Sequence, residues 1–293
     1  MHSKKNILIT GINGFLGSNL AKAISAKFNI IGLEYSLENL FRVANCNYKI
    51  YSAKEGILDT IFKDQPIDII LHTATIYGRN KEPLEAILAT NFMLPFSLFR
   101  LGIKYKVQAF INTDTVLDRN VSPYALSKAQ IRDWLQMYSS DLKVVNMQLE
   151  HFYGTGGSMD NFISLLVVKM LANTPLIDLT SGEQKRDFLY FDDVVTAFTT
   201  VINKLDSIND NYSNIQVASG EAVSIKNMVE IIKKLTNSSS VLNFGALPYR
   251  PNELMKPNTN SKALRALGWE PHVHIEKGLA ETIAYIKNKI KKT

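Results

Sequence analysis

Cysteine is almost absent from this sequence, in which Cys46 is the only one among 293 residues. A single thiol excludes an internal disulfide framework and a four-cysteine zinc site, and it suits a reducing compartment. The sequence also lacks an uninterrupted apolar run of the roughly 18 residues that a membrane span needs. Residues 1–6 lead into a short strand pattern rather than a signal peptide. We therefore expect a cytoplasmic protein without a membrane partner.

Acidic excess is lacking as well, because the formal net charge is +6. Part of this charge is the basic run 287–292, which is typical of a solvated, frayed helix end. The remaining excess suits a site for anionic, phosphate-bearing small molecules, and no nucleic-acid-binding module can be identified. Asp192 and Asp193 look like a metal pair, but acidic side chains also favour the start of a helix. We expect neither a nucleic-acid partner nor a bound metal.

Apolar strand patterns alternate with helical patterns along the first half of the chain. Strands are predicted at 6–10, 30–34, 67–72, 109–113 and 143–149, and helices at 18–28, 83–105 and 122–140. This alternation predicts an α/β fold with a doubly wound parallel sheet of the Rossmann type, covered by helices on both faces.

A smaller lobe is predicted from the C-terminal part, where turn-forming segments rich in Gly, Pro and Ser interrupt shorter helices. We expect a dinucleotide-binding domain at 1–149, to which 187–203 returns. The smaller, substrate-binding lobe is expected at 150–186 and 204–293.

A glycine-rich turn joins the first predicted strand to the first predicted helix. Gly11 permits a tight turn, Gly14 lets the backbone approach phosphates, and Gly17 lets the helix pack closely on the sheet. The backbone amides of such a turn and the helix N-terminus can accept a pyrophosphate. We therefore predict dinucleotide binding here. The neighbouring contacts are expected from Asn13, Phe15 and Leu16.

An acidic residue, Glu34, ends the second predicted strand about 20 positions beyond the glycines. A carboxylate there can hydrogen-bond the adenosine ribose hydroxyls and repel a 2′-phosphate, which favours NAD over NADP. Two alternatives stay open. Glu34 can be a solvated strand end, and Arg42 lies near enough in sequence to pair with a phosphate.

Tyr124 and Lys128 are four residues apart in a predicted helix, so they share one face. A cation beside a phenol stabilises the phenolate and makes Tyr usable as an acid or base. The preceding strand ends in a polar cluster, where open α/β sheets place their ligands. Thr113 is our candidate for holding the reacting oxygen, and Thr115 is the alternate.

These motifs together resemble the extended short-chain dehydrogenase/reductase superfamily of nucleotide-sugar epimerases, dehydratases and ketoreductases. The resemblance covers nearly the whole chain and continues at His72-Thr73-Ala74, at Asn91, at residues 150–154, at 186–194, at 250–253 and at 266–269. It implies catalysis by Thr113, Tyr124 and Lys128. It implies further cofactor contacts from His72, Thr73, Ala74, Asn91 and His151. His151 stands where the family has Asn. It implies contacts with a nucleotide-diphosphate sugar from Thr115, Asn161, Arg186, Arg250 and Glu253, although Arg186 and Arg250 are also compatible with structural salt bridges.

Segments 146–154, 180–195 and 243–255 most closely resemble the synthases of CDP-abequose and CDP-paratose. Those enzymes reduce the 4-keto group of CDP-4-keto-3,6-dideoxyglucose on the way to O-antigen sugars. The resemblance implies NADPH, whereas Glu34 favours NAD(H), so both coenzymes stay open.

Other functions within the superfamily also stay open. An NAD-dependent 4-epimerase would use the same residues, and a subunit that only binds a dinucleotide belongs to a different class. A 4,6-dehydratase is disfavoured, because the Thr-Asp-Glu triplet of dehydratases is Thr113-Asp114-Thr115 here. The two long helices at 91–105 and 125–140 resemble those that pair in the superfamily's dimers, so a homodimer is expected.

Overall fold

The computed structural model describes residues 4–53, 57–250 and 253–292. It divides into two compact units, Met1–Leu149 with Phe198–Ile215, and Glu150–Ala197 with Gln216–Thr293. Each unit has its own sheets and its own hydrophobic core.

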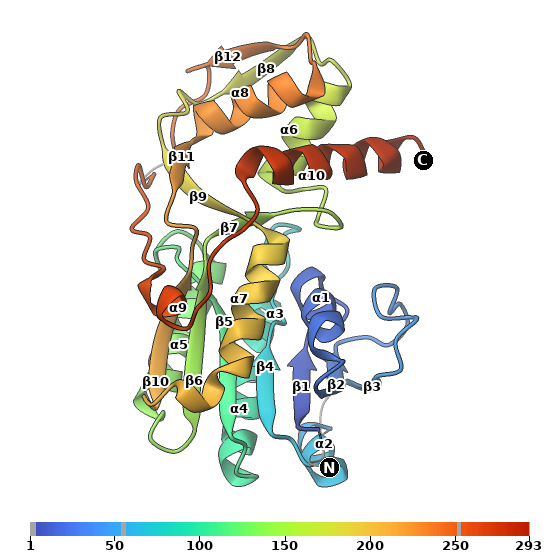
Figure 1. The fold of residues 1–293 in the computed structure, drawn as a ribbon, viewed down its shortest axis with the longest axis vertical. Helices are drawn as coiled ribbons and strands as arrows, with labels where there is room; N and C mark the ends of the chain where they lie inside the picture. Colours follow the sequence, from blue (N-terminus) through green and yellow to red (C-terminus); the bar gives the residue numbers. More distant parts are fainter. Residues whose placement is uncertain (1–3, 54–56, 251–252, 293) are drawn as a thin grey trace. The chain divides into compact units, whose positions relative to one another are not determined.

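A seven-stranded sheet with the strand order β10-β6-β5-β4-β1-β2-β3 forms the centre of the first unit (Figure 1). Neighbouring strands from β3 to β6 pair in parallel, which confirms the predicted Rossmann-type α/β fold. The strands are β1 (Asn6–Thr10), β2 (Asn29–Glu34), β3 (Lys49–Ser52), β4 (Ile69–His72), β5 (Ala109–Thr115), β6 (Lys143–Leu149) and β10 (Tyr212–Val217). The helices between them are α1 (Phe15–Ile24), α2 (Leu58–Asp64), α3 (Leu84–Leu88), α4 (Leu94–Lys104) and α5 (Pro123–Met137), and α7 (Phe191–Asn203) with a 3₁₀ turn (Leu205–Ser207) precedes β10.

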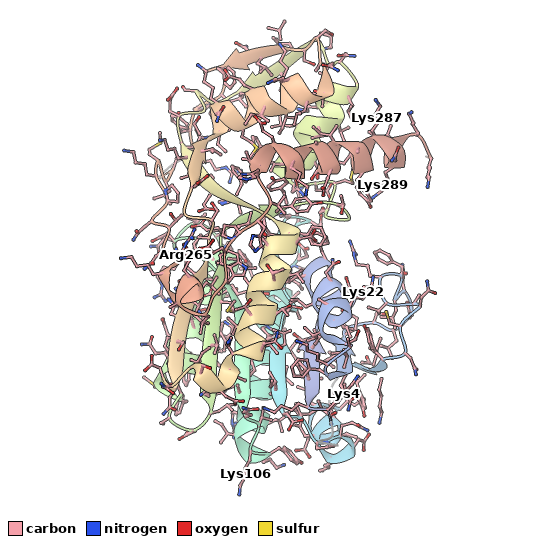
Figure 2. All side chains as sticks on the ribbon, in the orientation of Figure 1. Lys4, Lys22, Lys106, Arg265, Lys287 and Lys289 are labelled. Carbon is pink, nitrogen blue, oxygen red and sulfur yellow. The ribbon has the colours of Figure 1, made fainter. Side chains whose placement is uncertain are left out.

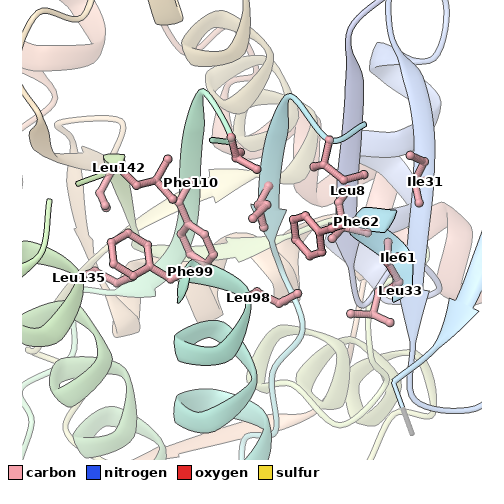
Figure 3. Close-up of a cluster of buried hydrophobic side chains, with 14 of the residues drawn as sticks. Leu8, Ile31, Leu33, Ile61, Phe62, Leu98, Phe99, Phe110, Leu135 and Leu142 are labelled. Atoms are coloured by element: carbon pink, nitrogen blue, oxygen red, sulfur yellow. The ribbon is translucent and has the colours of Figure 1, made fainter. Parts of the chain in front are cut away.

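The core of this unit lies between the strands and the helices α2, α4 and α5. Figure 3 shows Leu8 and Phe110 on strands, facing side chains such as Phe62 of α2, Phe99 of α4 and Leu135 of α5. These side chains are almost completely buried, and each stabilises the fold by roughly 1.5–3 kcal/mol relative to an exposed position. This packing fixes the strands whose carboxyl ends carry the candidate site.

A π-helical turn, Ala89–Met93, joins α3 to α4 in one continuous helix. By length and composition alone, the stretch Leu84–Lys104 could cross a membrane. Its polar residues Asn91 and Arg100 interrupt the apolar run, and α4 contacts β4 and β5 through buried side chains such as Leu98. The segment therefore serves as a covering helix of the sheet in this fold.

The second unit holds a three-stranded sheet, a two-stranded sheet and four helices among the described residues. Its strands are β7 (His151–Tyr153), β8 (Leu176–Leu179), β9 (Lys185–Tyr190), β11 (Ala222–Ser224) and β12 (Val241–Phe244). Its helices are α6 (Phe162–Leu171), α8 (Ile225–Thr236), α9 (Lys262–Ala266) and α10 (Ile275–Ile290). Residues of α6, α8 and α10 share one core. Lys287 and Lys289, labelled in Figure 2, lie inside α10, so the basic run expected to fray begins within a regular helix.

The segment that returns to the first unit differs from the expected one. The sequence predicted a return at 187–203, whereas the structure groups Phe198–Ile215 with the first unit. The reason is strand pairing, because β9 joins β7 and β11 in the smaller sheet, while β10 extends the large sheet beside β6. The large sheet also gains β3, an edge strand that the sequence did not predict.

Candidate active site

The strand order reverses between β1 and β4, which are neighbours in the middle of the large sheet. Parallel α/β sheets bind ligands at such a switch point, beyond the carboxyl ends of the strands. The glycine turn follows β1, the loop 73–83 follows β4, and the predicted catalytic residues lie at the end of β5 and at the start of α5. The sequence-predicted cofactor and catalytic residues of the first unit therefore lie at one edge of the sheet.

The glycine turn is packed so tightly that side chains have no room. Gly11 has a φ of +63°, and a Cβ there would lie 2.8 Å from the Cα of Ala74. A Cβ on Gly17 would collide with the carbonyl oxygen of Gly11 and lie 2.8 Å from the Oγ1 of Thr73. Gly14 is the N-cap of α1 and caps the helix with no side chain. Phe15 and Leu16 follow in the first turn of α1, so this geometry fits a pyrophosphate at the helix N-terminus.

Hydrogen bonds with the residues that follow β4 stabilise this turn. The hydroxyl of Thr10 accepts the backbone N–H groups of Thr73 (3.0 Å) and Ala74 (3.1 Å), while the Thr73 hydroxyl donates to the Thr10 carbonyl (2.6 Å). His72 is fully buried, with its Nδ1 2.8 Å from the Thr10 hydroxyl. Burial, followed by the charge of Lys128, holds the pKa of His72 well below its usual value, so the ring is neutral. Direct cofactor contacts by His72, Thr73 and Ala74 stay a prediction.

Glu34 is bound to the glycine turn itself. Its carboxylate accepts the backbone N–H of Asn13 (2.9 Å) and that of Tyr35 (3.0 Å). The side chain of Asn13 in turn accepts the N–H of Arg42 (2.9 Å) and donates to the carbonyl of Asn39 (2.8 Å). The guanidinium of Arg42 lies 4.6 Å from the centre of the Phe41 ring. The Glu34 carboxylate therefore stands directly beside the glycine turn.

Tyr124 and Lys128 share one face of α5, which begins at Pro123 with Ser122 as a side-chain N-cap. The ammonium of Lys128 is buried and donates to the backbone carbonyl of Thr113 (2.9 Å). Burial lowers the pKa of Lys128 to about 8. Burial is also the main reason that the pKa of Tyr124 lies above its ordinary value, whereas a hydrogen bond with the Thr115 side chain lowers it.

The hydroxyl of Thr113 is buried and has no hydrogen-bond partner within the described part of the chain. Buried hydroxyls are normally paired, so an unpaired one at the carboxyl end of β5 is a candidate partner for a ligand atom. Thr115 differs, because its hydroxyl accepts the N–H of Leu117 (3.2 Å). Of the two candidates, Thr113 is the one with a free hydroxyl to offer a reacting oxygen.

Asp114, between these two threonines, is a site residue to which the sequence analysis gave no role of its own. Its carboxylate is fully buried and forms an ion pair with Arg132 (2.7 Å). It also accepts the Asn146 amide (2.8 Å) and the backbone N–H of Thr115 (2.7 Å). In the sequence, the only sign of a role for Asp114 is its position between the two threonines. Its partners Arg132 and Asn146 are distant in sequence. These contacts hold the Asp114 carboxylate as a structural anchor of the β5 end.

Asn91 lies in the π-helical turn, and its side chain is fully buried. It accepts the N–H of Ile76 (2.9 Å) and donates to the carbonyl of Ile76 (2.8 Å) and to the hydroxyl of Ser127 (3.1 Å). The loop after β4 is thereby tied to α5. A direct contact between Asn91 and the cofactor would compete with these hydrogen bonds, and it stays a prediction.

Five predicted ligand-binding residues belong to the second unit. The guanidinium of Arg186 forms an ion pair with Glu253 and donates to the carbonyl of Leu254 (2.5 Å), which is the structural salt bridge that the sequence left open. Asn161 caps α6 by accepting the N–H of Ser164 (2.8 Å). Arg250 is exposed, and the segment around it, 251–252, lies outside the described residues. The Nδ1 of His151 is buried, has no hydrogen-bond partner among the described residues and lies 3.8 Å from the Glu150 carboxylate.

The strand order and the glycine turn at the switch point define a protein of the Rossmann class. Within that class, the sequence model of the NAD dependent epimerase/dehydratase family matches residues 7–217. The chain belongs to this family and is an enzyme of it.

Relatives with defined activities match nearly the full length of the chain. CDP-abequose synthase of Salmonella typhimurium is 30% identical over 96% of this chain and 98% of its own. The dTDP-D-glucose 4,6-dehydratase of Homo sapiens is 28% identical over 97% of this chain and 90% of its own. Among solved structures, the UDP-glucose 4-epimerase of Thermotoga maritima superposes with a TM-score of 0.83 at 22% identity, covering 97% of this chain and 99% of that one. The last likeness concerns the fold alone.

Proposed function

We propose that this protein is a nucleotide-sugar oxidoreductase that reduces the 4-keto group of a CDP-4-keto-3,6-dideoxyhexose. The observation that carries the reaction type is the buried, unpaired hydroxyl of Thr113 on the strand beside Tyr124 and Lys128. A ketone oxygen at this place receives a hydrogen bond from Thr113 and a proton from Tyr124. The likeness to CDP-abequose synthase over 96% of the chain supports the substrate.

The chain's own residues supply the proton and stabilise the charge. Bound NAD(P)H supplies the hydride that is added to the sugar C4. Tyr124 donates its phenolic proton to the C4 oxygen, and its raised pKa keeps it protonated beforehand. Lys128 stabilises the phenolate that remains, and Thr113 holds the developing alkoxide. The product is the 4-hydroxyl sugar, and Tyr124 is reprotonated from solvent.

The coenzyme we propose is NAD(H). The carboxylate of Glu34 stands beside the glycine turn through its bond to Asn13, where it can accept hydrogen bonds from the ribose hydroxyls. The same charge repels a 2′-phosphate. The resemblance to the CDP-abequose and CDP-paratose synthases implies NADPH instead, so the coenzyme has to be measured with both.

For the nucleotide diphosphate, we propose the second unit, with Arg250 as the exposed cation. Arg186 would bind the diphosphate only if it exchanged its ion pair with Glu253 for one with a phosphate. His151, in the place where the family has Asn, is proposed as a cofactor contact rather than as a ligand of the diphosphate.

A 4-epimerase is the second candidate, because the NAD-favouring Glu34 suits an enzyme that keeps its coenzyme bound. A dehydratase is supported less. Thr115 replaces the Glu of the dehydratase triplet, and the Asp114 carboxylate is held by Arg132 and Asn146 rather than free to act as an acid.

We also propose that the cytoplasmic enzyme is a homodimer that pairs through α4 and α5. Phe92, Phe96, Trp134 and Tyr138 form one aromatic cluster across the π-helical turn and these helices, with Phe96 and Trp134 5.4 Å apart. Trp134 and Met137 are exposed by 42% and 73%. A second copy would bury this apolar surface.

The proposed reaction is tested by a spectrophotometric assay at 340 nm with CDP-4-keto-3,6-dideoxyglucose and either NADH or NADPH. We expect coenzyme consumption with a 3,6-dideoxyhexose product identified by NMR. Absence of consumption, together with NAD retained in the purified protein, contradicts the reductase and favours the epimerase.

A further inference from the structure

Three side chains of the first unit are stacked in the order Arg79, Tyr77, Tyr124. The guanidinium carbon of Arg79 lies 4.7 Å from the centre of the Tyr77 ring. The Tyr77 ring centre lies 4.9 Å from that of Tyr124, with the planes inclined by 42°. Tyr77 and Arg79 come from the loop between β4 and α3, so a second element contacts the proposed proton donor.

The loop that presents this pair is anchored by Asn91 and is also bonded within itself by Glu82. Asn91 binds the backbone N–H and the carbonyl of Ile76 (2.9 and 2.8 Å). The carboxylate of Glu82 accepts the backbone N–H of Asn80 (2.9 Å). Gly78 has a φ of +73°, a conformation that lets the chain turn between Tyr77 and Arg79. The pair is therefore fixed by the loop and does not depend on its own contact alone.

We propose that Tyr77 and Arg79 act as a positioning pair for Tyr124, in which Tyr77 holds the phenol ring and Arg79 places a positive charge behind it. The proposal rests on the proposed reductase function, because it assigns a role relative to the proton donor. A cation over an aromatic face is attracted by the ring quadrupole, and two inclined aromatic rings restrict each other's rotation. Neither residue touches the reacting atoms in this role.

The other charged and titratable groups around Tyr124 come from β5 and from its own helix. Asp114 of β5 raises the pKa of Tyr124, and its carboxylate forms an ion pair with Arg132. Lys128 of α5 donates to the Thr113 carbonyl. Burial and the Tyr77 phenol raise the pKa of Tyr124, whereas the Thr115 hydrogen bond and the charge of Arg79 lower it. Arg79 thus works in the direction that eases proton release.

Two variants separate this role from a general charge effect. Arg79→Gln removes the stacked cation. Lys81→Gln removes an exposed cation two residues away in the same loop, where the backbone φ is +59°. Both variants change the net charge equally, so a difference between them reports the place of the cation, and of the two only Arg79 lies in the stack.

The readout that does not require turnover is ¹⁹F NMR of a fluorotyrosine at position 124. Several ring fluorines make the phenol much more acidic than that of tyrosine, and the fluorine shift also reports contact with the Tyr77 ring. We expect Arg79→Gln to move the titration to higher pH and Lys81→Gln to leave it where the unsubstituted protein has it. Equal titrations in Arg79→Gln and Lys81→Gln overturn the proposal.

Activity and ring substitutions complete the test. Arg79→Gln should lower kcat/KM roughly 3- to 10-fold at neutral pH, less than the about 10²- to 10⁴-fold effect of losing a proton donor.

Tyr77→Phe should keep the ¹⁹F shift and the activity, whereas Tyr77→Ala should change both. A Tyr77→Ala protein with an unchanged ¹⁹F shift contradicts the holding role. If the unsubstituted enzyme shows no reduction, the proposed function fails, while the NMR titration still decides the positioning role.

Discussion

Lys128 is the residue whose charge sets the pH range of the proposed reaction. Its pKa is lowered to about 8 by burial, so it is an ammonium below that pH and neutral above it. Stabilising a Tyr124 phenolate needs the charged form. We therefore expect kcat/KM, which reports the free enzyme, to fall as the pH rises through about 8.

The substitution Lys128→Arg checks this assignment, since an arginine stays charged throughout the accessible range. It should move the alkaline decline to higher pH even where it lowers the overall rate. A wild-type profile that stays flat to pH 10 contradicts the role given to Lys128.

Glu34 is predicted to decide the choice of coenzyme. Glu34→Ala removes the carboxylate that we expect to bind the ribose, so KM for NADH should rise by about 10-fold, the effect of one hydrogen bond to a charged group. Use of NADPH should improve in the same variant. Glu38→Ala, which removes an exposed acid four residues away, is the control and should change neither. Unchanged kinetics with both coenzymes in Glu34→Ala would show that Glu34 is only a solvated strand end.

At the residue scale, the sequence could predict groups that a local motif carries. The glycines, Tyr124, Lys128 and Thr113 belong to such motifs, and the structure brings them to one edge of the sheet. The partners of Asp114 could not be predicted, because Arg132 and Asn146 meet it only after folding. The salt bridge of Arg186 illustrates the same limit, since its carboxylate partner is 67 residues away.

At the scale of elements, the π-helical turn is the feature that links the scaffold to the site. It directs Asn91 toward Ile76 and Ser127, and thereby ties the loop after β4 to α5. A regular helical pattern in the sequence predicts the helix at 83–105, but it contains no signal for one additional residue in a turn. The edge strand β3 was missed for a related reason, because it is only partly buried and has no apolar run.

Asn91→Leu should destabilise the fold, because it leaves the backbone groups of Ile76 without their buried partners. We expect a loss of about 1–3 kcal/mol in the free energy of unfolding, measured by urea denaturation. Asn120→Leu, at an exposed position, should change it by no more than about 0.5 kcal/mol. Equal stabilities of the two variants would exclude a structural role for the Asn91 side chain.

At the scale of the whole molecule, the aromatic cluster on the π-helical turn, α4 and α5 predicts the oligomeric state. Sedimentation should show a species of twice the 32.9 kDa mass of one chain. Trp134→Glu should convert it to a monomer, because a carboxylate would be buried without a partner at the contact. Tyr285→Glu alters an exposed aromatic residue of the second unit and should leave the dimer intact. A wild-type protein that sediments as a monomer contradicts this interface.

The α/β class and the division of the chain into two parts could be predicted from the sequence. The segment that returns to the first unit could not. Alternating apolar patterns are local and reveal β1 to β6 with the exception of β3. Strand pairing is not local, and it assigns β9 to a small sheet and β10 to the large one.

The central claim is that hydride reaches the sugar C4 while Tyr124 supplies the proton. The measurement that tests it most directly is a single turnover with NADH deuterated at the transferred position and CDP-4-keto-3,6-dideoxyglucose, followed by NMR of the product. We predict one deuterium at C4 of a 3,6-dideoxyhexose and loss of the reaction in Tyr124→Phe. A product without deuterium at C4, or an undiminished rate in Tyr124→Phe, would contradict this mechanism.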